Sequence, residues 1–269
     1  MNTVKNIQCN HPSITSMYGM YRNCKNMVGS APVCGSNVTN MAYAYYQCSN
    51  LKGSPVCGSK VTNMVNAYYY CHNITGSPVC GSNVTNMAYA YYYCPNITGS
   101  PACGNNVTSM AYTYYQCSNL TGRAVCGSNV TNMYNTYFRC NQLTTAVCGN
   151  KVTDMSYTYM YCTNLTTPVC GNNVTTMRST YDGCTNLTTA VCGPNVSTFW
   201  STYADCVKLT TPVCGNNVTY MTNAYEGCTN LTTAVCGPNV TSLANTYANC
   251  IKLTTPVCGN KVVNMPGAY

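Results

Sequence analysis

The side chains of this 269-residue sequence that could do chemistry are mainly thiols and phenols, supplied by 23 cysteines and 26 tyrosines. Only four carboxylates and two histidines are present, which leaves few groups for acid–base catalysis. The sequence has no nucleophile elbow, no His-Glu-x-x-His motif and no phosphate-binding loop. We therefore predict a protein that is not an enzyme, has no catalytic residues and uses no cofactor.

Every cysteine belongs to one of two regularly spaced series. The first recurs every 23 residues from Cys34 to Cys126 and every 22 residues after that, and the second follows it by 14 residues. Disulfides could join each second-series cysteine to the next first-series one, or Cys34 to Cys48 and so on along the chain. Under the first pairing, the early repeats would be stapled by Cys48, Cys57, Cys71, Cys80, Cys94 and Cys103.

A second interpretation of these cysteines leaves the second series as free thiols, packed as small hydrophobic side chains in a core. The spacing alone does not choose between these arrangements. A metal site is not expected, because the sequence has no Cys-x-x-Cys pair and its cysteine spacings do not match those of tetrahedral zinc sites.

Tyrosine marks an inner and an outer position in each repeat. The third residue before every second-series cysteine is Tyr, which predicts a buried ring whose hydroxyl reaches a partner. The next two positions are aromatic in early repeats but become Asp, Glu, Ala, Gly or Asn later, so we expect them to be exposed. The candidate ligand-binding residues at these positions are Tyr46, Tyr69, Tyr70, Tyr92, Tyr93, Tyr115 and Phe138.

Charge divides the chain in the same way. Residues 1–150 carry a net charge of +7 with no acidic residue, and residues 151–269 carry +1. A basic surface rich in tyrosine suits a cell-surface glycan or protein. The positive charge is spread thinly along the chain, and no nucleic-acid recognition motif accompanies it. Nucleic-acid binding is therefore not predicted. No apolar run is long enough for membrane insertion, and no signal peptide is visible.

The repeats predict how these side chains are positioned. Each repeat has six regularly apolar positions, too few to close a core, so neighbouring coils must stack and share one. We expect Pro-Val-Cys to be one short strand of a parallel ladder. The spacing of apolar residues from Met64 to Cys71 predicts a helical or 3₁₀ turn.

Three regions follow from the repeat lengths. Residues 1–33 form an atypical N-terminal coil or cap, 34–125 contain the basic, Tyr-rich 23-residue repeats, and 126–269 contain the 22-residue repeats. The last coil is incomplete, and isolated solenoid ends expose their core. We therefore expect self-association or docking through the C-terminal end.

The motif Asn-Val-Thr-Asn-Met, followed by a small residue with Tyr and then Cys-x-Asn-Leu, resembles the BspA-like leucine-rich repeat family of surface proteins. The resemblance covers approximately residues 14–265 and implies a right-handed solenoid, here of about eleven coils, used for adhesion without catalysis. The compressed Pro-Val-Cys-Gly strand and its cysteine depart from the family pattern.

From these observations we expect a structural or adhesion module on an extracellular surface, either of a bacterium or of a phage virion, that binds a cell-surface ligand. The alternative is an architectural subunit that assembles into a fibre or a decoration layer.

Overall fold

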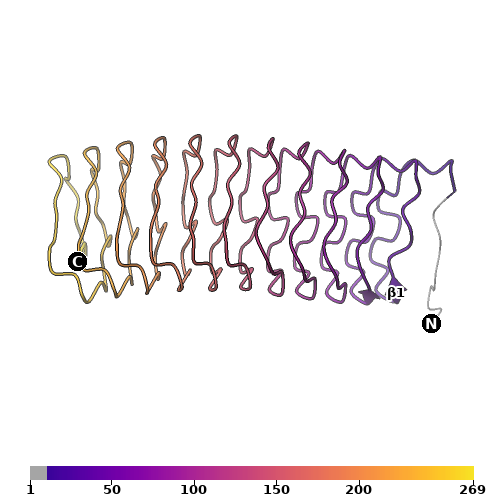
Figure 1. The fold of residues 1–269 in the computed structure, drawn as a ribbon, viewed down its shortest axis with the longest axis horizontal. Helices are drawn as coiled ribbons and strands as arrows, with labels where there is room; N and C mark the ends of the chain where they lie inside the picture. Colours follow the sequence, from indigo (N-terminus) through magenta and orange to yellow (C-terminus); the bar gives the residue numbers. More distant parts are fainter. Residues whose placement is uncertain (1–10) are drawn as a thin grey trace.

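The computed structural model describes residues 11–269, in which successive windings of the chain stack side by side along one long axis (Figure 1). Two short strands, β1 (Gly29–Ser30) and β2 (Leu51–Lys52), pair in parallel with Gly29 opposite Leu51. The predicted repeat solenoid is confirmed. The proposed N-terminal cap is described only in part, because residues 1–10, including Cys9, lie outside the described range.

Parallel pairing between coils continues through single-residue bridges in two columns. One column passes through the residue before each core methionine, as in Asn40–Asn63 and Asn63–Asn86. The other lies at the corner where the repeats shorten, as in Thr145–Thr167. In the 23-residue repeats this corner contains a glycine with positive φ, for example Gly76 at 77°.

The predicted strand at Pro-Val-Cys is wrong, since no parallel bridge forms there among the described residues. The hydroxyl of the inner tyrosine of the same coil hydrogen-bonds to the backbone N–H and carbonyl that a parallel strand would use for pairing. Val56 N–H donates to the Tyr68 hydroxyl at 2.8 Å, and that hydroxyl donates to the Val56 carbonyl at 2.8 Å. The phenol therefore fastens the segment to its own coil instead of leaving it free to pair with a neighbour.

The predicted helical turn is also wrong. Residues 64–71 form consecutive turns in which Asn66 and Tyr70 have positive φ values of 56° and 57°. A helix would need every residue in the right-handed region. Alternate N–H groups here leave the coil and bond to the next one, as Tyr68 N–H does to the Ala90 carbonyl at 2.8 Å.

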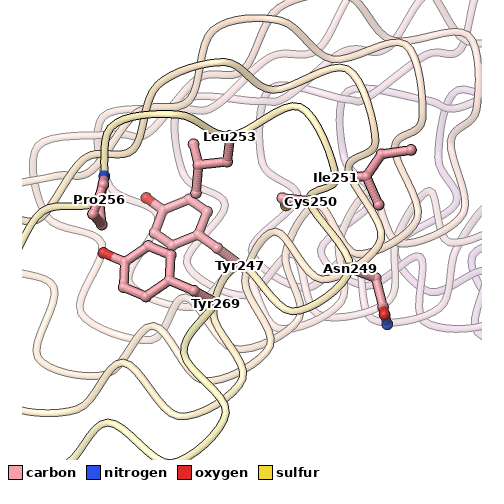
Figure 2. A pocket seen from close by; sticks show the side chains of 7 residues that line it. All are labelled: Tyr247, Asn249, Cys250, Ile251, Leu253, Pro256 and Tyr269. Carbon is pink, nitrogen blue, oxygen red and sulfur yellow. The ribbon is translucent and has the colours of Figure 1, made fainter.

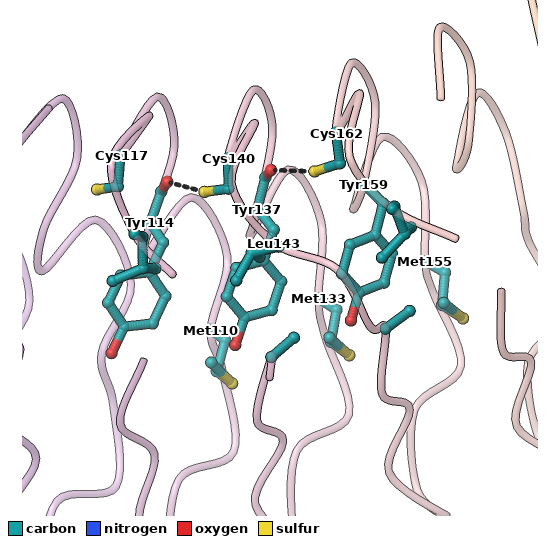
Figure 3. Close-up of a cluster of buried hydrophobic side chains, with 14 of the residues drawn as sticks. Met110, Tyr114, Cys117, Met133, Tyr137, Cys140, Leu143, Met155, Tyr159 and Cys162 are labelled. Atoms are coloured by element: carbon teal, nitrogen blue, oxygen red, sulfur yellow. Dashed lines mark hydrogen bonds between the residues drawn. The ribbon is translucent and has the colours of Figure 1, made fainter. Parts of the chain in front are cut away.

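One continuous core runs along the rod and is built around an inner tyrosine ladder (Figure 3). Neighbouring inner rings stack with centroids 5.0–5.8 Å apart. Apart from Tyr269, the rings are almost fully buried, so each of their hydroxyls needs a polar partner. The ladder consists of Tyr21, Tyr45, Tyr68, Tyr91, Tyr114, Tyr137, Tyr159, Tyr181, Tyr203, Tyr225, Tyr247 and Tyr269.

Of the alternatives left open for the cysteines, the structure shows free thiols at all 22 cysteines of residues 11–269. Second-series thiols point into the core and donate to a tyrosine carbonyl of the preceding coil, as Cys140 Sγ does to Tyr114 at 3.1 Å (Figure 3). First-series thiols turn to other partners, such as the Gly58 carbonyl, 3.6 Å from Cys57 Sγ. The two series therefore do not face each other.

Burial further protects the thiols from oxidation. It raises the pKa of Cys48 to about 12 and of Cys57 to about 11, and it raises the pKa of Cys71 well above its ordinary value. Because the thiolate is the form that reacts, a raised pKa keeps these groups in their less reactive protonated form at neutral pH. The same holds for Cys80, Cys94 and Cys103, whose pKa values burial also raises. From Cys48 to Cys250, the second-series cysteines are buried in the core, as their interpretation as small hydrophobic residues requires, whereas Cys24 is half-buried.

Candidate functional site

The turn between the core methionine and the buried cysteine positions the outer aromatic side chains. Its first bend is fixed by an asparagine side chain, whose Oδ1 accepts the Val65 N–H at Asn63 (3.0 Å). Two left-handed residues follow, at Asn66 and Tyr70, each of which costs a non-glycine residue on the order of 1–2 kcal/mol. The backbone bonds to the next coil offset this cost and hold the turn rigidly. As a result the inner ring points into the core and the next two side chains point outward.

The position after each inner tyrosine forms an outer aromatic file: Tyr46, Tyr69, Tyr92, Tyr115 and Phe138. Neighbouring rings lie 4.5–4.7 Å apart with interplanar angles of 2–13°. This spacing equals the separation of neighbouring strands in a sheet, which is about 4.8 Å. Three rings of the file, Tyr69, Tyr92 and Tyr115, have a neighbour on each side. Both faces of these rings are therefore covered, and they present their edges and hydroxyls to solvent.

An arginine lies at each end of the outer aromatic file. The Arg22 guanidinium sits 5.2 Å from the Tyr46 ring centroid. At the other end, Arg139 lies 5.5 Å from Phe138 and 5.2 Å from Tyr161. Tyr161 also turns edge-on to Phe138, at 82°, which ends the stack. The cations cover the ring faces that the stacking leaves open, and they add positive charge at both ends of the file.

Two shorter stacks flank the outer aromatic file and widen it into a surface. Tyr70 and Tyr93 stack at 5.0 Å on one side, with the His72 ring 5.1 Å from Tyr93. Tyr89 and Tyr112 stack at 4.6 Å on the other side. The seven aromatic residues proposed from the sequence thus lie on one continuous surface. Their role in binding stays a prediction.

The phenols of Tyr69, Tyr92 and Tyr112 on this surface have a raised pKa and therefore stay neutral hydrogen-bond donors at neutral pH. Burial, together with neighbouring phenols, raises the pKa of Tyr69 and Tyr92, and raises that of Tyr112 to about 12. Burial lowers the pKa of His72, so that ring is held in its neutral form. The fixed charges of the surface are therefore those of its arginines and lysines.

In the later repeats, carboxylates replace the aromatic rings. Asp182 and Glu226 occupy the position of the outer aromatic file, and Asp205 follows that position by one residue. Burial raises the pKa of Asp182 to about 7, and the nearby charges of Asp205 and Glu226 contribute. These carboxylates come from separate coils, and their closeness depends on how the coils stack, which the sequence does not show.

A second aromatic group was missed from the sequence. Trp200 and Tyr220 are exposed to 42% and 59%, and they line a cavity of about 340 Å³ together with Thr198 and Thr222. Two signals could have found it. Trp200 is the only tryptophan of the chain, and Tyr220 stands where other repeats carry a small polar residue or a carboxylate.

The last coil contains another cavity of about 340 Å³, lined mainly by Tyr247, Leu253, Pro256 and Tyr269 (Figure 2). The Tyr269 ring is the final member of the inner tyrosine ladder and is 47% exposed. Core side chains are therefore accessible at this end of the described rod.

Residues 11–269 contain no group of three or more His, Cys, Asp or Glu side chains that could hold a metal ion. Within the same range, no helix has the length and apolar character needed to cross a lipid bilayer.

Comparison with known families agrees with this geometry. The model described as "BspA type Leucine rich repeat region (6 copies)" matches residues 66–187 and 156–267. The chain belongs to the BspA-type leucine-rich repeat family. Residues 3–101 also match a model described as a Mycoplasma protein of unknown function, DUF285. No curated protein matches the sequence significantly.

Solved structures place this BspA-type protein among bacterial leucine-rich repeat folds. A leucine-rich repeat protein from Bacteroides ovatus is 14% identical with a TM-score of 0.56, covering 94% of this chain and 78% of that one. One from Eubacterium ventriosum is 17% identical with a TM-score of 0.42, covering 86% and 78%. At these identities the likeness of the first structure concerns the fold alone.

Membership also carries general properties. BspA-type proteins are typically surface-associated and generally act in adhesion or protein interaction, and the wider leucine-rich repeat family is generally non-enzymatic and binds protein ligands. This BspA-type chain departs from a plain leucine-rich core by building its interior from stacked tyrosine and cysteine columns.

Proposed function

We propose that the protein is a non-enzymatic adhesion module whose outer aromatic surface binds a ligand on a cell surface, and that this ligand is a protein. The single observation that carries the choice is the stacking of the outer aromatic file at 4.5–4.7 Å. A sugar binds an aromatic residue mainly through the ring face, and the faces within the file are already covered. Ring edges and hydroxyls remain, and these suit hydrogen bonding to a protein surface.

Charge supports the same proposal. Arg22 and Arg139 lie at the ends of the outer aromatic file, and no acidic residue occurs in residues 1–150. We therefore expect the partner to present acidic groups, which would speed association at low salt. Tyrosine and arginine are also the residue types that most often dominate the binding energy of protein interfaces.

Binding of the full chain to an array of cell-surface proteins and to a glycan array tests this proposal. We expect a hit on the protein array that is weakened at least a hundredfold in a variant with Tyr69, Tyr92 and Tyr115 changed to Ala. The matched control changes Asp182 and Glu226 to Ala and should bind as the unchanged protein does. Binding to glycans alone, or equal binding by the triple variant, would contradict the proposal.

One observation favours the alternative of an architectural subunit. The Tyr269 ring borders a cavity and is 47% exposed, so a coil of a second subunit could stack on it. Sedimentation at several concentrations tests self-association, and a strictly monomeric species would count against it. Whether the module sits on a bacterium or on a virion stays a prediction.

A further inference from the structure

The cavity between Trp200 and Tyr220 is separate from the outer aromatic surface and has the opposite stacking geometry. No aromatic ring stacks on Trp200 or Tyr220 within residues 11–269, so their faces are not taken by neighbouring rings, as those of Tyr92 are. Both side chains are large and well exposed. Open aromatic faces beside a cavity are the feature that the outer aromatic file lacks.

One face of the Trp200 indole is covered by a cation. The Arg178 guanidinium lies 4.1 Å from the Trp200 ring centroid, and it also lies 5.5 Å from Tyr157. Arg178 comes one coil before Trp200, and Thr222, which lines the cavity, comes one coil after it. The guanidinium therefore covers one face of the indole, and the other face is left open toward the cavity.

This arrangement restricts what the cavity can bind. A cation on one face of an aromatic ring weakens the attraction of the ring for a second cation, so a quaternary ammonium group is disfavoured. The volume of about 340 Å³ is at the low end for ligand cavities, which run from about 300 to 1,000 Å³, and it fits one ring better than a peptide segment.

The exposed lining of the cavity is almost wholly apolar, and Thr198 and Thr222 lie beside the two aromatic side chains. An open aromatic face at the protein surface matches a pyranose ring, which can stack its apolar C–H face on the aromatic ring and keep its hydroxyls toward water. We infer that the Trp200–Tyr220 cavity is a binding site for a single sugar ring of a cell-surface glycan.

Because Trp200 is the only tryptophan, its fluorescence reports on this cavity and on no other part of the protein. The experiment titrates the full chain with methyl β-glucoside, methyl β-galactoside and methyl β-N-acetylglucosaminide, while tryptophan emission is recorded. The peptide Gly-Leu-Gly and tetramethylammonium serve as rival ligands. We expect a saturable change in emission with at least one pyranoside and none with the rivals.

Variants at exposed positions locate the site. Tyr220→Ala should weaken pyranoside binding at least tenfold, Tyr220→Phe should retain it, and the matched control Tyr112→Ala, on the outer surface, should leave it unchanged. Circular dichroism checks that Tyr220→Ala folds. The inference is overturned if none of the pyranosides changes the emission, if only a rival ligand does, or if Tyr220→Ala binds as tightly as the unchanged protein. Tyr69, Tyr92 and Tyr115 take no part, so this result and that of the proposed function are independent.

Discussion

In the 23-residue repeats, the position after each inner tyrosine carries an aromatic ring that stacks on its neighbours, as Tyr92 does on Tyr69 and Tyr115. In the 22-residue repeats from Asp182 onward, the same position carries Asp, Ala or Glu. The inner tyrosine ladder does not change between the two regions, and its spacing stays within 5.0–5.8 Å. Neighbouring positions in one turn are thus under different constraints, and only the outer one varies between the two regions.

The largest expected effect comes from removing an inner ring, and it should be equal in the two regions. Tyr114→Ala and Tyr225→Ala each delete a fully buried ring and leave a cavity. Each should lower the free energy of unfolding by about 3–5 kcal/mol, measured by urea denaturation. A loss confined to one region would show that the two sets of repeats do not share one kind of interior.

A smaller effect should separate the outer positions of the two regions. Tyr92 stacks on two rings at 4.7 and 4.6 Å, and such contacts are worth about 0.5–1.5 kcal/mol each. Solvation of the groups freed by Tyr92→Ala offsets part of this loss, so the substitution should lower the free energy of unfolding by about 1 kcal/mol. Glu226→Ala, at the equivalent later position, should stay within about 0.5 kcal/mol of the unchanged protein. A Tyr92 variant as unstable as Tyr114→Ala would mean that the outer rings hold the fold.

The smallest effect concerns pH and only the later repeats. The folded protein raises the pKa of Asp182 from 3.8 to about 7, so the folded state binds its proton more tightly than the unfolded state does. Stability should therefore be greatest below about pH 4 as far as this group is concerned, and should fall as the pH rises toward 7. Partial exposure of the carboxyl limits the size of the change.

Asp182→Asn should flatten this part of the profile of unfolding free energy against pH, because the amide does not titrate. Urea denaturation between pH 4 and pH 8 measures the difference between the two proteins. An identical slope in both would show that Asp182 ionises in the folded state as easily as in the unfolded chain.

Much of the fold could be predicted from the sequence because the same pattern of residue types recurs in every repeat. The invariant tyrosines identified the core, and the variable positions beside them identified the outer surface. The turn was misread because Met64, Tyr68 and Cys71 have the spacing of a helix face, and consecutive turns with alternating left-handed residues give the same spacing. Only the backbone bonds to the next coil distinguish the two, and these depend on contacts between coils.

The other errors have similar causes. A strand at Pro-Val-Cys fits the local composition, but the Tyr68 hydroxyl takes the N–H and carbonyl of Val56. The cysteine spacing left disulfides and free thiols open as alternatives, because the direction of a thiol depends on the backbone that surrounds it. The Trp200–Tyr220 cavity was missed because its two aromatic residues come from neighbouring coils and occupy different positions in the repeat.

The central claim is that the inner tyrosine of each turn stabilises the fold, whereas the tyrosine after it belongs to the outer surface. Removing one hydroxyl from each of two adjacent residues tests this claim most directly. The Tyr114 hydroxyl donates to the Ala102 carbonyl at 2.6 Å and accepts its N–H at 3.0 Å, whereas Tyr115 belongs to the outer aromatic file. In urea denaturation, Tyr114→Phe should lower the free energy of unfolding by about 1–3 kcal/mol, because it leaves the partly buried N–H and carbonyl of Ala102 without this partner. Tyr115→Phe should change it by less than about 0.5 kcal/mol. Equal losses, or a larger loss at Tyr115, would contradict the division.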